Sequence, residues 1–261
     1  MKTFGTEWKK TIRDGTFIHA GHIFLPSAAL GEAMAAYGLK YIWVDGEHGA
    51  FDKDAILAHI TAINGAGAGV FVRVTSGDPA TIKPVLEMGP DGIIIPMVNT
   101  AEEARRVVAA CRYPPKGTRG FGPRRANRYG VVEDPEYIAS IDEALVKFIQ
   151  VEHREAVDNL DDILGVDGID GVIIGPYDLS GSMGLLGQLR HPDMLAQYQR
   201  IVACCKAHKM PCGPSIAPSN PDWVKYWLDL KVDYLFCGDE LTYVRRGIDD
   251  TKALIARLRA S

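Results

Sequence analysis

The stretch YIWVDGEHGAFD, residues 41–52, joins a short apolar run to a group of acidic and imidazole side chains. Its first four residues are aromatic or β-branched, which favours a buried strand. Asp45, Glu47 and His48 follow directly, and Asp52 then begins a helical pattern as a candidate N-cap. In α/β folds the carboxyl ends of strands face the ligand crevice. The stretch therefore predicts a strand, a chemically active loop and a helix, although a plain polar loop explains these three side chains about as well.

The same alternation of a strand with a helix continues along the chain. Apolar runs predict strands at residues 17–22, 41–45, 69–74, 92–97, 147–152, 171–175, 210–213 and 233–237. Helical patterns follow at 27–37, 52–65, 78–89, 100–110, 192–208, 219–230 and 240–258. One more follows the strand at 147–152 and ends near residue 164. A polar connection at 112–130, a short helix from Asp134 and a glycine-rich connection at 176–187 interrupt the pattern.

Eight such units predict a single (β/α)8 TIM barrel domain covering residues 1–261. Strands that are apolar throughout suit a parallel sheet covered by helices. A doubly wound open sheet is the competing arrangement, and it would need a glycine-rich phosphate turn after the first strand. The residues at that place, GHIFLPS at 21–27, do not match GxGxxG.

Composition and charge exclude several classes of protein. The chain is 47% hydrophobic and 24% charged, as in ordinary soluble proteins. Its net charge of −4 argues against a general nucleic-acid surface. No apolar run is long enough for a membrane span, and residues 1–15 lack the apolar segment of a signal peptide. The five cysteines are odd in number and show no CxxC spacing, so we expect a cytoplasmic protein with reduced thiols.

Polar side chains gather where the predicted strands end. Because the carboxyl ends of barrel strands share one rim, we expect them to lie close together. Each also has a plain structural interpretation: Arg73 as the partner of a core carboxylate, Glu152 as a helix-start acid and Asp178 as a turn cap. The set comprises Asp45, Glu47, His48, Arg73, Gln150, Glu152, Gly175, Pro176, Tyr177, Asp178, Ser215, Asp239 and Glu240.

Glu152 and Asp178 are candidate ligands of a hard divalent cation. Two carboxylates, completed by water and substrate oxygens, are typical of Mg²⁺ or Mn²⁺ sites. Without a cation, two converging acids would repel each other and one would take up a proton. Of the histidines, His19 and His22 favour packing or rim positions, and His153 favours a helix start.

Longer motifs along nearly the whole chain resemble the HpcH/HpaI family of class II pyruvate aldolases, which includes 4-hydroxy-2-oxoheptanedioate and 2-dehydro-3-deoxyglucarate aldolases. Besides Arg73, they are WVDGEHGAFD (43–52), IIIPMVNTAEEARRVV (93–108), YPPKGTRGFG (113–122), FIQVEHREAVDNL (148–160) and DGVIIGPYDLSGSMG (170–184). The resemblance implies a barrel enzyme that reversibly splits 4-hydroxy-2-oxo acids into pyruvate, as its enolate, and an aldehyde. It also implies a homo-oligomer, a hexamer or trimer, whose C-terminal helix is exchanged between subunits.

The resemblance also assigns roles to residues that match the family motifs. Glu152 and Asp178 would bind Mg²⁺, Mn²⁺ or Co²⁺, and Arg73 would face the keto oxygen of pyruvate. These positive charges would stabilise the negative charge that develops on that oxygen. The resemblance also implies that His48 and Asp45 form an acid/base dyad and that Gln150 contacts the substrate. The backbone of Gly175, Pro176 and Tyr177 would bind the carboxylate of pyruvate, and Glu47 would hold a metal-bound water.

Two alternatives and several departures stay open. Decarboxylation of oxaloacetate, or a related 2-oxo acid lyase reaction through the same enolate, is the second enzymatic hypothesis, and a barrel that only binds an oxo acid is the non-enzymatic one. The sequence departs from the pattern of that family in three places. The first strand differs near His22, His153 stands where threonine is common, and Arg124, Arg125 and Arg128 form a basic cluster. That cluster is either a solvated loop or a clamp for an anionic aldehyde. The aldehyde, the stereochemistry and the native metal therefore remain open.

Overall fold

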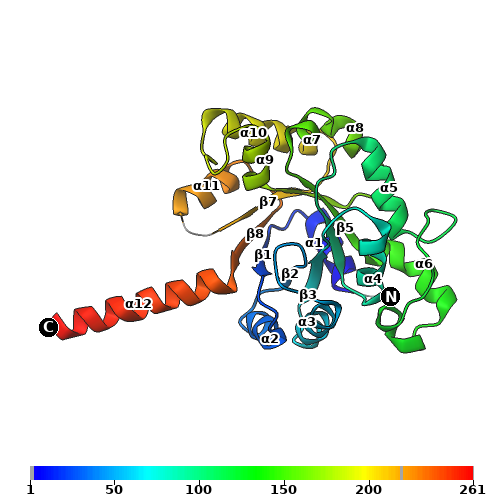
Figure 1. Cartoon of the computed structure of the whole chain (residues 1–261), viewed down its shortest axis with the longest axis horizontal. Helices are drawn as coiled ribbons and strands as arrows, with labels where there is room; N and C mark the ends of the chain where they lie inside the picture. The colour runs from blue at the N-terminus through cyan, green and yellow to red at the C-terminus, as the bar shows by residue number, and fades with distance from the viewer. Residues whose placement is uncertain (1–2, 218–219, 261) are drawn as a thin grey trace.

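Eight parallel strands close into a barrel in the computed structural model, which describes residues 3–217 and 220–260 (Figure 1). Each strand pairs with the next, and β8 pairs with β1. This confirms the predicted TIM barrel. The strands are β1 (Ile18–Ile23), β2 (Tyr41–Asp45), β3 (Gly69–Arg73), β4 (Gly92–Ile95), β5 (Val146–Val151), β6 (Gly171–Ile174), β7 (Cys212–Ile216) and β8 (Tyr234–Asp239).

Helices follow every strand and form the outer shell, apart from α12, which points away from it (Figure 1). The predicted caps are present: Asp52 accepts the Ala55 N–H at 2.8 Å, and Thr100 forms a capping box with Glu103. The helical elements are α1 (Phe4–Arg13), α2 (Ala28–Ala36), α3 (Lys53–Gly65), α4 (Pro79–Glu87), α5 (Ala101–Cys111), the 3₁₀ segment η1 (Arg125–Gly130), α6 (Asp134–Ala144), α7 (Arg154–Asp158), α8 (Leu160–Leu164), α9 (Pro176–Ser182), α10 (Pro192–Ala207), α11 (Pro221–Asp229) and α12 (Glu240–Ala260).

The helix α1 was not predicted, and it contributes to the barrel interior. Its Trp8 is buried and packs edge-on against Tyr41 and Phe71, with ring centroids 4.8 and 4.9 Å apart. Phe148 and Phe236 complete this aromatic cluster with their rings near the same tryptophan. In so short a segment, an amphipathic pattern alone is weak evidence for a helix, because short helices are marginal in isolation. The stability of α1 comes from burying Trp8 in the barrel.

The start of β7 and the presence of α9 also differ from the prediction. Strand β7 begins at Cys212 rather than Met210, because the Met210 N–H closes the end of α10 by donating to the Cys205 carbonyl at 2.8 Å. Helix α9 lies inside the predicted glycine-rich connection at 176–187, where Pro176 occupies its first turn. The predicted helix start at Ser219 lies outside the described residues, and α11 is described from Pro221.

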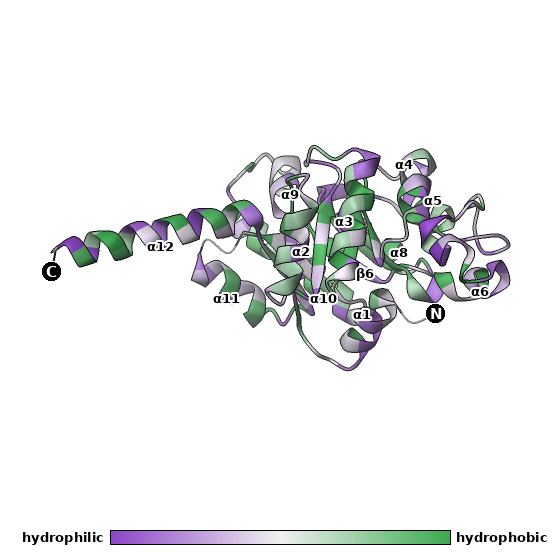
Figure 2. Cartoon of the chain, turned by 90° about the horizontal axis from the view of Figure 1, so that it is seen from below, coloured by the Kyte–Doolittle hydropathy of each residue, from purple (hydrophilic) through white to green (hydrophobic). Residues whose placement is uncertain are grey.

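Helix α12 extends from the end of β8 away from the barrel (Figure 1). Apolar and polar residues alternate along it (Figure 2). Its apolar side chains recur at spacings of three, four or seven residues, which places them on one face, and they are exposed by roughly half: Leu241, Val244, Ile248, Ile255 and Leu258. In the described part of the chain, no helix is both long and apolar enough to cross a membrane.

Candidate active site

Asp45 and Arg73 occupy facing positions at the carboxyl ends of β2 and β3. The two residues are register partners, and both are buried. The Arg73 Nε–H donates to one Asp45 oxygen at 3.1 Å, and its Nη2–H donates to the other. Such a two-point contact between guanidinium and carboxylate fixes both groups in one plane. The arginine is thus a rigid positive charge at the rim of the barrel.

Further contacts hold the same guanidinium. Its Nη1 lies 3.0 Å from a Glu47 oxygen and donates to Gln150 Oε1 at 3.3 Å. The guanidinium carbon also lies 4.8 Å from the centre of the Trp43 ring, within range of a cation–π contact. The structure therefore brings together four of the predicted residues, Asp45, Glu47, Arg73 and Gln150.

Glu152 lies next to this group, at the end of β5, and only 3% of it is exposed. One carboxylate oxygen accepts the Met97 N–H at 2.8 Å, and the other accepts the Gln150 amide at 2.8 Å. Burial raises the pKa of Glu152 to about 7, and the nearby Asp178 carboxylate adds to the rise. A Cβ on Gly175 would lie 2.7 Å from the Glu152 carboxylate, so glycine is required there to leave room for it.

Asp45, Arg73, Gln150 and Glu152 line one cavity of about 360 Å³ at the carboxyl end of the barrel. Asp178 contributes from the first turn of α9 and is exposed. Its charge also acts on Glu47, whose pKa is raised, mainly by burial. The lining comprises His22, Phe24, Asp45, His48, Arg73, Gln150, Glu152, Gly175, Pro176, Tyr177, Asp178, Ser215, Ile216, Ala217 and Asp239.

The acidic groups of this cavity fit a divalent cation. In residues 3–217 and 220–260, no basic side chain lies within ion-pair distance of Glu152, although it is buried. A buried carboxylate without an opposite charge is costly, and a bound cation removes this cost. Asp178 lines the same cavity and offers a second carboxylate there. An all-oxygen donor set suits hard cations.

His48 lies on the loop after β2, and its ring is not placed against Asp45. The Asp45 carboxylate instead accepts the backbone N–H groups of Glu47 and His48, at 3.1 and 3.0 Å. His48 is exposed and its side chain lines the cavity. Asp45 thus orients the loop that carries His48 through its backbone.

The backbone at the start of α9 limits the predicted carboxylate cradle. The Gly175 N–H donates to the Val151 carbonyl at 3.2 Å, and Pro176 has no N–H. The first N–H groups of a helix lack partners within the helix. At the start of α9, the backbone N–H groups without a partner inside the helix are therefore those of Tyr177 and Asp178.

His22 is a cavity residue that sequence reasoning assigned to packing or the rim. Its Nδ1–H donates to the Gly238 carbonyl at 3.3 Å, so its Nε2 accepts the Ser215 hydroxyl at 2.9 Å. Burial lowers the pKa of His22 to about 4, which keeps the ring neutral. Its position near the end of the first strand was the available signal, because the register pairs it with Asp239 at the same rim.

Other predicted candidates have structural contacts elsewhere. Glu240 accepts the backbone N–H groups of Phe24 and Leu25 and so holds the loop after β1. His153 caps α7, as predicted, by accepting the Glu155 N–H at 3.2 Å. Arg125 donates to the Met88 and Gly89 carbonyls just before β4, at the end of the barrel opposite to the cavity. Arg124 and Arg128 are exposed.

Comparison with known proteins gives consistent matches over most of the chain. A sequence profile of the HpcH/HpaI aldolase/citrate lyase family matches residues 22–218. The chain is 37% identical to a 5-keto-4-deoxy-D-glucarate aldolase of Salmonella arizonae over 224 residues, 85% of this chain and 86% of the relative. It is also 37% identical to a 4-hydroxy-2-oxo-heptane-1,7-dioate aldolase of Salmonella dublin over 238 residues, 90% and 88% of the two chains. A solved structure of an HpcH/HpaI aldolase/citrate lyase family protein from Burkholderia cenocepacia superposes with a TM-score of 0.89 at 25% identity, covering 97% of this chain and 99% of the other.

Proposed function

Since the chain belongs to the HpcH/HpaI aldolase/citrate lyase family and is a carbon–carbon lyase, we propose that it reversibly splits 4-hydroxy-2-oxo acids into pyruvate and an aldehyde. The observation that carries this proposal is the buried Glu152 carboxylate, which lies without an ion-pair partner among the described residues. It shares its cavity with Asp178 and with the immobilised Arg73. The cavity therefore offers carboxylates that can bind a cation and a guanidinium that can bind the oxygens of an oxo acid.

Glu152 and Asp178 would hold the divalent metal, Mg²⁺, Mn²⁺ or Co²⁺. When bound, the metal supplies Lewis-acid stabilisation of negative charge on the keto oxygen. The oxygens of Glu152 are directed by the Met97 N–H and the Gln150 amide, so this ligand is positioned before a metal arrives. Gly175 keeps the space beside it free.

Arg73 would bind the keto oxygen of the oxo acid. Its guanidinium is held by Asp45, Glu47 and Gln150, so its charge needs no reorganisation during the reaction. Such fixed charges stabilise a developing oxyanion better than mobile ones. The Tyr177 and Asp178 backbone N–H groups would contact the substrate carboxylate, since Gly175 donates elsewhere and Pro176 has no donor.

His48 would move the proton of the aldol hydroxyl. An imidazole can both donate and accept a proton, and this ring lines the cavity on a loop that Asp45 anchors. Neutral His22, hydrogen-bonded to Ser215, lines the same cavity and would shape the space left for the aldehyde.

The test is proton NMR of pyruvate in D₂O with metal-stripped enzyme, before and after adding Mg²⁺. We expect the methyl signal to disappear only with metal, because enolate formation exchanges the methyl protons. Glu152→Gln should abolish this exchange, while Asp239→Asn, a matched loss of charge in the same cavity, should retain it. Exchange that continues in Glu152→Gln would refute the metal assignment. Faster turnover of 4-hydroxy-2-oxo acids than of oxaloacetate would separate the aldolase from the decarboxylase alternative.

We further propose a homo-oligomer, a hexamer or trimer in which α12 packs against another subunit. The helix carries its apolar residues on a surface that its own barrel leaves exposed. Burial of such a surface is a strong driving force for association. The base of α12 also adjoins a largely apolar groove lined by Phe17, Val224 and Leu228, which continues this surface onto the barrel.

We propose that the enzyme acts in the cytoplasm on small molecules and needs neither nucleic acid nor membrane. All five cysteines are free thiols, and four of them are buried. Free thiols are usual in a reducing compartment. The net charge of −4 gives no support for a nucleic-acid surface.

A further inference from the structure

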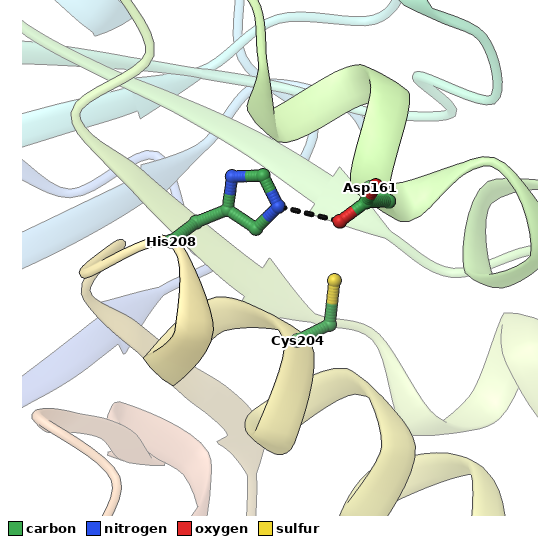
Figure 3. Close-up of side chains that lie close together, drawn as sticks. All are labelled: Asp161, Cys204 and His208. Atoms are coloured by element: carbon green, nitrogen blue, oxygen red, sulfur yellow. Dashed lines mark hydrogen bonds and ion pairs between the residues drawn. The ribbon is translucent and has the colours of Figure 1, made fainter.

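A second group of metal-binding side chain types lies outside the active-site cavity, between α8 and α10. Asp161, Cys204 and His208 place a carboxylate oxygen, a sulfur and an imidazole nitrogen within 4.8 Å of one another. In Figure 3 the side chains point toward a common space, and the Cys204 sulfur is directed at the gap between the other two. None of the three residues lines the active-site cavity.

Helix geometry brings these side chains together. Cys204 and His208 are four residues apart at the end of α10, so they share one face of that helix. Asp161 is in the first turn of α8, which packs against α10. The His208 Nε2 and an Asp161 oxygen are hydrogen-bonded at 2.6 Å. Three ligands from two packed helices are therefore already close to a common point.

The three groups differ in accessibility in a way that suits capture of an ion from solution. The side chain of Asp161 is 85% exposed, whereas that of His208 is 27% exposed and Cys204 is partly buried. An ion bound at about 2.0–2.3 Å from each ligand separates neighbouring ligand atoms by roughly 3.3 Å or more. The 2.6 Å hydrogen bond must therefore open, and the exposed Asp161 side chain is free to move.

We propose that Asp161, Cys204 and His208 bind a borderline-soft divalent transition metal such as zinc(II) or cobalt(II), with water as a fourth ligand. Sulfur and imidazole ligands favour such ions, while the oxygen-only set of Glu152 and Asp178 favours hard cations. Binding releases the thiol proton of Cys204 to solvent. It also requires the proton on the His208 Nε2 to be displaced, so that the ring binds as the neutral tautomer protonated on Nδ1.

The bound ion would cross-link α8 to α10 without touching the reacting groups. Both helices lie in the outer shell (Figure 1), and in the chain α8 lies between β5 and β6, the strands that lead to Glu152 and Gly175, while α10 comes after β6. The metal would act as a structural clamp. Cobalt(II) or zinc(II) added to metal-stripped enzyme would then fill two different places, whereas Mg²⁺ would fill only the active-site cavity.

The experiment is titration of the metal-stripped full-length enzyme with cobalt(II), followed by absorption spectroscopy. A cysteine ligand gives a thiolate-to-cobalt charge-transfer band in the near ultraviolet, which an oxygen-only site does not produce. We expect the band in the wild-type enzyme and in Glu152→Gln. We expect its loss in Cys204→Ser and in His208→Asn, together with loss of one bound cobalt per chain.

Asp162→Asn is the matched control, because it removes an exposed charge next to Asp161. It should keep the band, while Asp161→Asn should weaken cobalt binding at least tenfold. Circular dichroism of each variant checks that the chain is folded. Absence of the band from wild-type enzyme, or its persistence in folded Cys204→Ser, would overturn the proposal and leave the His208–Asp161 hydrogen bond as a simple link between helices.

Discussion

The Asp45 carboxylate forms a two-point ion pair with Arg73 across the β2–β3 register and also accepts the backbone N–H groups of the following loop. One buried carboxylate thus positions the arginine and the segment carrying Glu47 and His48. The arginine in turn contacts Glu47 and Gln150, and Gln150 contacts Glu152. The polar groups of the candidate site therefore form one connected network, whose members depend on one another for orientation.

Asp45→Asn should strongly destabilise the protein. The amide cannot replace the charge, so the buried Arg73 would be left without its main partner, which costs about 3–5 kcal/mol. Urea unfolding of wild type and variant measures the loss. Asp158→Asn is the control, because Asp158 pairs with Arg200 at an exposed site where about 1 kcal/mol or less is expected. Equal small losses in both variants would contradict a structural role for the Asp45–Arg73 pair.

Arg73→Lys should lower kcat by about 10²-fold or more, because an ammonium group cannot reproduce the fixed guanidinium contacts that aim its charge. Steady-state kinetics on a 4-hydroxy-2-oxo acid with saturating metal measures the effect. Arg200→Lys, at an exposed ion pair, should leave kcat unchanged. An unchanged kcat in Arg73→Lys would show that this arginine does not act in the rate-limiting chemistry.

Metal affinity should depend on pH through Glu152, whose pKa is raised to about 7 by burial. Below that pH the carboxyl is protonated and the proton competes with the metal. The apparent affinity should therefore fall about tenfold for each pH unit below 7 and level off above it. Calorimetric titration with Mn²⁺ across this range measures the slope. A flat profile would show that Glu152 is not the ligand whose ionisation limits binding.

His22 should contribute to acid sensitivity. Burial lowers its pKa from 6.5 to about 4, so between these values the unfolded chain binds a proton that the folded chain does not. Its contribution to stability is present above pH 6.5 and is lost as pH falls toward 4, at about 1.4 kcal/mol per unit, or about 3 kcal/mol in all. His22→Gln should flatten this part of the stability profile, measured by denaturant unfolding, whereas His191→Gln at a partly exposed position should retain it. An identical slope in His22→Gln and wild type would disprove the assignment.

Association should depend on the apolar face of α12. The double substitution Ile248→Asn and Ile255→Asn removes two exposed apolar side chains from that face, and it should reduce the molar mass in solution toward that of one chain. Light scattering at micromolar concentration measures the mass. Asp250→Asn with Arg257→Asn changes the opposite side of the helix, keeps the net charge and should preserve the oligomer. A monomeric wild-type protein would contradict the proposed assembly.

Local pattern was enough to predict the order of the eight strand–helix units, most of their caps and the barrel. Apolar runs, helical spacing and capping residues act over a few residues, so they can be read along the chain. The polar residues at the strand ends were predicted for the same reason, because closure of a parallel barrel brings all carboxyl ends to one rim.

Long-range packing determined which of those residues touch. Strand register places Asp45 opposite Arg73, so the Asp45 carboxylate contacts the guanidinium and not the His48 ring. Barrel closure also brings His22 within hydrogen-bond distance of Ser215 in the cavity wall. The burial of Trp8 in the barrel and the approach of Asp161 to His208 join segments far apart in the chain. Such contacts depend on how strands align and helices pack after the barrel closes, and no local pattern of residues carries that information.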